Sequence, residues 1–198
     1  MDIPQLLPPG AYPVILIIYT IRNLITPWKT RGRLWKGISQ VITSPMTPPT
    51  FFTIYIGDVF TSMVKVFQDV CWSICFVLSG DFGFADRNGG SLRNWQVTFW
   101  YKNLLIPLVC LLPLWFRFCQ CLRRYVDSGT RFPHLANAFK YALSQTVTLF
   151  GAFHPLYLLT CPSESKNKNN WFQGFWLLLF VSSSLYSFFW DVYMDWGM

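Results

Sequence analysis

The chain has 198 residues, of which 53% are hydrophobic, 19% aromatic and only 13% charged, and its formal net charge is +7. Soluble domains carry about 25% charged residues, so the composition excludes an ordinary soluble protein and indicates a membrane protein. The positive charges stand in short segments between apolar runs, as membrane topology requires, and this arrangement argues against a nucleic-acid partner.

The apolar runs predict an all-α fold: a polytopic transmembrane helical bundle with four full spans, one partial N-terminal span and an amphipathic surface helix. Tyr12–Ile25 is the partial span, because its length of about 14 residues is below the roughly 20 that cross the hydrocarbon core. Residues 27–36 are basic and contain two tryptophans, and Ile38, Val41 and Ile42 follow at helical spacing. This pattern predicts the amphipathic helix, on the cytoplasmic surface.

Residues 51–78 are the next expected span, and this span carries ionisable side chains. Asp58, Ser62, Lys65 and Asp69 recur at steps of four, three and four, which predicts one polar helical face. A charge at the centre of a span costs about 2.5 to 3.5 kcal/mol on insertion scales, so such groups face a bundle interior or a wet cavity. Lys65 and Asp69 can neutralise each other, whereas Asp58 has no local partner, and we expect it to pair across helices or to act in function.

Further spans are expected at residues 99–118, 137–159 and 171–196. The most basic segment of the chain follows the first of these, and its cations are Arg117, Arg123, Arg124, Arg131 and Lys140. Two interpretations stay open: topology signals that contact lipid head groups, or an electropositive vestibule that concentrates an anion. Lys140 favours the anion, because it stands in the first turns of a spanning helix, where the helix dipole attracts negative charge.

The fifth apolar segment has acids at its cytoplasmic end. Ser184, Ser187, Asp191 and Asp195 share one face there. The acids can be head-group residues beside an aromatic belt, but two acids at this end oppose the positive-inside tendency unless cations meet them. We therefore expect them to pair with the basic segment.

Enzymatic chemistry finds little support in the sequence. The six cysteines show no spacing typical of metal sites, and the chain has only two histidines. Nucleophile-elbow and phosphate-loop patterns are also lacking. We expect neither an enzyme, nor a cofactor, nor a bound metal.

Three blocks of the sequence carry a family resemblance: residues 57–62 with Asp69 further along, residues 115–141 and residues 190–197. In these blocks the chain resembles the EXS domain of the phosphate-exporter family that includes the xenotropic and polytropic retrovirus receptor. The resemblance runs from about residue 34, which divides the chain into a partial span with a basic linker (1–33) and a partial EXS transmembrane domain (34–198).

The resemblance implies a membrane protein that moves inorganic phosphate out of the cytosol. By similarity, the phosphate path would be lined by Asp58, Thr61, Lys140, Tyr141, Asp191 and Asp195. Its cytoplasmic side would carry a basic mouth, formed by Arg117, Arg123 and Arg124. The acids would hold the cations in place or take part in gating and would not bind phosphate directly. Lys65 departs from the family pattern, which favours an apolar residue at this position.

The same resemblance leaves partners and role open. We expect the SPX sensor domain and the later spans of exporters, with their phosphate-binding arginines, to lie outside this chain. One alternative is a non-transporting interaction or sorting protein, related to Golgi-type EXS proteins, that partners a full-length homologue; another is a carrier for a different anion. Membrane lipids and a second copy of the chain are further expected partners, in the plasma membrane or in the Golgi and other endomembranes.

Overall fold

The computed structural model describes residues 11–79, 95–160 and 170–197, and its regular elements in these ranges are all helical. The long helices are α1 (Ala11–Ile25), α2 (Trp28–Ile42), α3 (Phe51–Ser62), α4 (Val64–Ser79), α5 (Ile106–Ser128), α6 (His134–Thr160) and α7 (Asn170–Trp190). The short turns are the 3-10 turn η1 (Trp95–Val97) and the π-helical turns η2 (Tyr101–Leu105) and η4 (Asp191–Asp195). The expected all-helical fold class is confirmed.

The described residues support two or three membrane spans. Tyr101–Ser128 and Gly174–Asp195 are each long and apolar enough to cross a bilayer. Phe51–Ser62 and Val64–Ser79 pass the same test only together, because the pair is bent by 67° at its break. Val14–Ile25 is apolar but short, as expected for a partial span. The count of four full spans stays a prediction.

The single helix expected over residues 51–78 is wrong, because the chain bends between α3 and α4. The hydroxyls of Thr61 and Ser62 both donate to the Asp58 carbonyl, at 2.7 and 3.3 Å. Hydroxyls that bond back to the preceding turn weaken a helix and bend it. The bend divides the expected polar face: Asp58 stays on α3, whereas Lys65 and Asp69 are exposed on α4 and pair at 2.6 Å.

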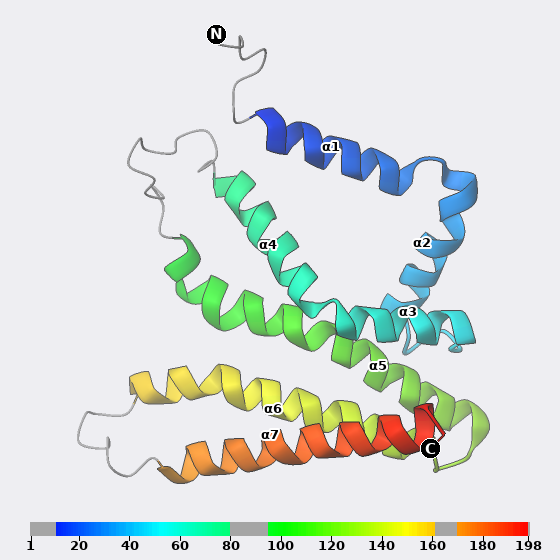
Figure 1. Cartoon of the computed structure of the whole chain (residues 1–198), viewed down its shortest axis with the longest axis vertical. Coiled ribbons are helices and arrows are strands. Elements are labelled where there is room, and N and C mark those ends of the chain that lie inside the picture. The colour runs from blue at the N-terminus through cyan, green and yellow to red at the C-terminus, as the bar shows by residue number, and fades with distance from the viewer. Residues whose placement is uncertain (1–10, 80–94, 161–169, 198) are drawn as a thin grey trace.

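Figure 1 shows α5, α6 and α7 side by side, with α3 and α4 along the other side of α5 and with α2 crossing the direction of these long helices. The crossing direction of α2 is the one that a helix lying along the membrane surface would take. Polar contacts join α6 to α7: the Tyr186 hydroxyl donates to the Ala136 carbonyl at 3.0 Å, and Trp176 Nε1 donates to the Val147 carbonyl at 3.2 Å.

The basic loop expected after the third span is mostly helix. α5 continues to Ser128, so Arg117, Arg123 and Arg124 all lie on it. The helix ends at Gly129, whose φ of 69° is left-handed and therefore suits glycine, and whose N–H donates to the Tyr125 carbonyl. A short connection then leads into α6, and a small core between α5 and α6 contains Cys121, Ala138 and Tyr141.

Candidate functional site

Arg117 lies in the interior of the bundle, where α3, α5 and α6 meet. Its exposed fraction is 5%. Nε lies 2.7 Å from the Asp58 carboxylate, whose side chain is 49% exposed, and also donates to the Tyr141 hydroxyl at 3.2 Å. The Tyr141 hydroxyl in turn donates to Asp58 at 3.3 Å. The cross-helix ion pair expected for Asp58 is therefore present, and its partner is Arg117.

Gln120 fixes the guanidinium of Arg117 from the far side. The Gln120 amide oxygen accepts from Arg117 Nη1 at 2.8 Å, and its amide nitrogen donates to the Thr53 carbonyl at 3.0 Å. Gly57 makes room for this contact, since a Cβ there would lie 2.6 Å from Arg117 Cδ and 2.8 Å from the Gln120 amide oxygen. α3 can approach α5 this closely only with glycine at position 57. Sequence reasoning missed Gln120, although its place one turn after Arg117 on an apolar helix is a usable signal.

A second ion pair joins α6 to the end of the last helix. Lys140 Nζ lies 3.0 Å from the Asp191 carboxylate, and their side chains are 10% and 45% exposed. The π-helical turn Asp191–Asp195 closes with the Trp196 N–H on the Asp191 carbonyl at 2.9 Å. Such turns frequently occur at functional sites. The pairing of this acid with the basic segment agrees with expectation.

Tyr141 stands between the two cations. The centre of its ring lies 5.2 Å from the Arg117 guanidinium carbon and 5.1 Å from Lys140 Nζ. Both distances are within the range of a cation–π interaction. Because the hydroxyl of the same ring also contacts Asp58, Tyr141 is in contact with both ion pairs.

Four of these side chains, those of Asp58, Lys140, Tyr141 and Asp191, border an open cavity of about 400 Å³. Its lining includes all six residues of the expected phosphate path: Asp58, Thr61, Lys140, Tyr141, Asp191 and Asp195. Ser62, Ser144 and Ser187 add hydroxyls, while Leu114 and Trp196 add apolar surface. The lining thus combines the Lys140 ammonium with three carboxylates and several hydroxyls, a set of groups able to hold an oxyanion, and Arg117 lies behind it in contact with Asp58 and Tyr141.

The three arginines of the basic mouth do not form one cluster. Arg117 is buried between α3 and α6, whereas Arg124 is exposed near the free end of α5. Arg123 pairs with Asp127 on the same helix at 3.0 Å. Arg117 therefore lies against the cavity residues Asp58 and Tyr141, and a role for the three arginines at a cytoplasmic entrance stays a prediction. Among the described residues, no group of three His, Cys, Asp or Glu side chains could hold a metal ion.

Comparison with known proteins gives the family relationship. A model of the EXS family matches residues 2–198. The chain is 32% identical over 195 residues to SPX and EXS domain-containing protein 1 of Dictyostelium discoideum, covering 96% of this chain and 20% of that protein. It is 30% identical over 202 residues to solute carrier family 53 member 1 of Homo sapiens, covering 98% and 28%. A xenotropic and polytropic retrovirus receptor 1 homolog of Xenopus laevis is 30% identical over 191 residues, covering 94% and 27%. The chain spans about a fifth to just over a quarter of the length of these relatives.

Proposed function

This chain belongs to the EXS family, and we propose on that premise that its polar cavity lines a path for the export of inorganic phosphate across a membrane. The family and its solute-carrier relatives point to a membrane transporter rather than an enzyme. The plasma membrane or an endomembrane is the proposed location.

The observation that supports the proposal is that two cations are buried and that each is paired with a carboxylate. Arg117 and Lys140 are both buried, and each is neutralised by a carboxylate that is about half exposed to the cavity. A buried cation without a partner is costly, so the carboxylates compensate the two positive charges and hold both side chains in place. Phosphate oxygens suit a guanidinium and an ammonium as well as a carboxylate does. An entering phosphate can therefore exchange with Asp58 or Asp191.

Exchange with a resident carboxylate also limits how tightly phosphate is held. A conducting site must bind its ion well enough to admit it and weakly enough to release it. The aspartates compete for the same cations, so they return to Arg117 and Lys140 when phosphate leaves. This role agrees with the expectation that the acids hold the cations and do not bind phosphate directly.

Phosphate efflux from proteoliposomes, compared between the wild type and Lys140→Ala, tests the proposal. We expect the substitution to reduce the flux at least about tenfold, because a loss of about 1.4 kcal/mol of binding free energy already changes occupancy by that factor. Lys65→Ala is the matched control, since Lys65 is also a lysine paired with an aspartate but is 78% exposed on α4. Equal flux in the wild type and both variants would overturn the site assignment.

A second candidate function is that of a non-transporting membrane interaction protein. The exposed apolar side chains of α1, which include Leu16 at 65%, Ile18 at 61% and Tyr19 at 62%, favour it because they offer a surface for other membrane helices. Co-purification with a full-length relative, together with an absence of flux from this chain alone, would support this function over transport.

A further inference from the structure

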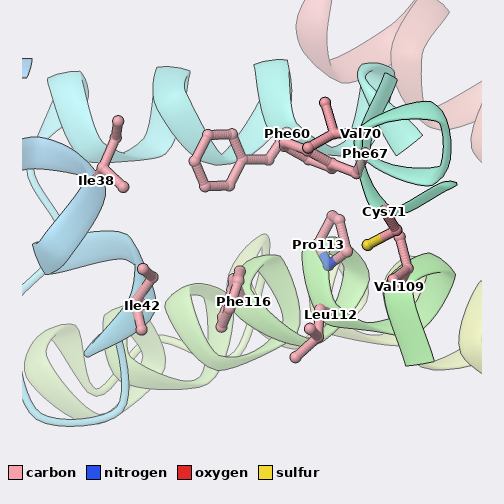
Figure 2. Close-up of a pocket in the computed structure, with 10 residues that line it drawn as sticks. All are labelled: Ile38, Ile42, Phe60, Phe67, Val70, Cys71, Val109, Leu112, Pro113 and Phe116. Carbon is pink, nitrogen blue, oxygen red and sulfur yellow. The ribbon is translucent and has the colours of Figure 1, made fainter. Parts of the chain in front are cut away.

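A second cavity, of about 600 Å³, lies between α2, α3, α4 and α5 and has a different chemistry. Figure 2 shows Ile38 and Ile42 of α2 at one end and Cys71 and Val109 at the other. Every side chain that lines it is apolar, the Cys71 thiol included. The volume is in the range of pockets that bind small molecules, roughly 300 to 1,000 Å³.

This cavity is separate from the phosphate path. On α5 it is lined by Val109, Leu112, Pro113 and Phe116, which recur at helical spacing on one face. Leu114, the residue of α5 that lines the polar cavity, is two positions from Leu112 and Phe116 and therefore faces the opposite side. Because an apolar cavity offers no partners to water, a hydrocarbon chain is its natural occupant within a bilayer.

The end of the cavity at α2 is next to a strongly basic helix. The cations of α2 are Lys29, Arg31, Arg33 and Lys36, and the helix contains no acid. Arg31, Trp35, Ile38 and Ile42 recur at steps of four, three and four, so they share one face. Trp35 Nε1 donates to the Leu24 carbonyl at the end of α1.

Along this face of α2, the charged residue comes first and the apolar residues follow. Ile38 and Ile42 line the cavity, while Arg31 stands seven residues before Ile38, about 10 Å along the helix. A phospholipid has the same arrangement, with an anionic phosphate at one end and an acyl chain at the other. The basic helix favours a lipid with net negative charge, since each Lys or Arg near such a surface contributes about 1 kcal/mol.

We propose that this cavity holds one acyl chain of an anionic phospholipid from the leaflet that borders α2, and that Arg31 binds its phosphate group. The site is independent of the phosphate path and is occupied whether or not the chain transports phosphate. The lipid fills the space at the α3–α4 bend and fixes α2 against the rest of the bundle.

Photolabelling of the full chain in lipid vesicles tests the proposal. The probes are phosphatidylglycerol and phosphatidylcholine with the same photoreactive group near the end of one acyl chain, and labelled peptides are located by mass spectrometry. We expect the anionic probe to label residues 67–71 and 109–116 several-fold more than the zwitterionic probe does. Equal labelling by the two probes would contradict the assignment of the head group.

Two pairs of variants test the binding of the acyl chain and the binding of the head group independently. Val70→Trp fills the cavity and should reduce labelling of α5 several-fold, whereas Val66→Trp, one turn away on α4, should not; the two valines are 48% and 47% exposed, and only Val70 lines the cavity. Arg31→Gln should reduce labelling by the anionic probe to the level of the zwitterionic probe, whereas Arg33→Gln should not.

The variants also show which results would overturn the proposal. Unchanged labelling in Val70→Trp excludes an acyl chain in the cavity. An absence of labelling of residues 67–71 and 109–116 by either probe shows that no acyl chain enters the cavity. If Val70→Trp fails to fold, the comparison of Arg31→Gln with Arg33→Gln decides, because both positions are on the surface of α2.

Discussion

At the scale of single residues, the site depends on side chains that hold Arg117. Gln120 is 1% exposed and connects the guanidinium to the backbone of α3. Asp58 supplies the opposite charge, and Tyr141 supplies a neutral hydroxyl. A guanidinium held at several atoms keeps one orientation. Gly57 is essential to this arrangement, because any larger residue would enter the space of Arg117 and Gln120.

Gly57→Ala tests the close approach of α3 to α5. We expect this substitution to lower the free energy of unfolding by about 1 to 3 kcal/mol, because overpacking forces Arg117 and Gln120 to move. Thermal unfolding in detergent measures the effect. Gly174→Ala is the matched control, since a Cβ there has no neighbour within 4 Å. A melting temperature lowered equally by both substitutions would contradict the packing argument.

At the scale of elements, the bend between α3 and α4 places the two halves of this segment beside different cavities. α3 presents Asp58 and Thr61 to the polar cavity, whereas α4 lies beside the apolar cavity with Val70 and Cys71. A straight helix would keep Asp58 and Asp69 on one face. The bend instead leaves the Lys65–Asp69 pair exposed, which makes it a local pair with no part in the site.

The hydroxyls of Thr61 and Ser62 should maintain the bend. The double variant Thr61→Val, Ser62→Ala removes both bonds to the Asp58 carbonyl, so we expect the segment to straighten. Spin labels at Tyr55 and Leu78, both exposed, would be about 35 Å apart along a straight helix and about 29 Å apart at 67°. Electron paramagnetic resonance should therefore show a longer distance in the double variant, and an unchanged distance would show that packing alone sets the bend.

The sequence predicted that Asp58 would form an ion pair between helices, but it did not identify the partner residue. Spacing showed that Asp58 lacks a local partner, but Arg117 as its partner is a contact between helices that no local pattern reports. The bend after Ser62 escaped prediction because the apolar pattern continues across Met63 without a proline or glycine. The resemblance placed Arg117 in a cytoplasmic mouth, whereas its side chain is buried where α3, α5 and α6 meet. Its burial follows from Gly57, whose effect appears only when α3 and α5 are packed together.

At the scale of the whole molecule, the charged elements gather at one end. Figure 1 shows α2, the connection between α5 and α6, and the C-terminal end of the chain at the same end of the bundle, with the end of α4 opposite. α2 carries its four cations at this end, and Arg123, Arg124 and Arg131 lie at or beside the α5–α6 connection. The positive-inside tendency predicts that this end is cytoplasmic.

Thiol labelling with a membrane-impermeant maleimide tests this orientation. We expect Ser39→Cys on α2 and Thr130→Cys after α5 to react only when cell membranes are permeabilised, because both positions are exposed at the cytoplasmic end. Leu78→Cys, 79% exposed at the far end of α4, should show the opposite accessibility. The wild type gives the background from the native cysteines. Different behaviour of Ser39→Cys and Thr130→Cys would contradict the arrangement.

Tyr141 contacts both ion pairs. Its ring contacts Lys140 and Arg117, and its hydroxyl contacts Asp58, so we expect a change at either pair to alter the free energy of the other. Such coupling is reciprocal: if an anion at Lys140 weakens the hold of Asp58 on Arg117, an anion at Arg117 weakens the hold of Asp191 on Lys140 by the same amount. In the proposed phosphate path, this one aromatic side chain would make the two neighbouring cations successive sites whose affinities for a single ion depend on each other.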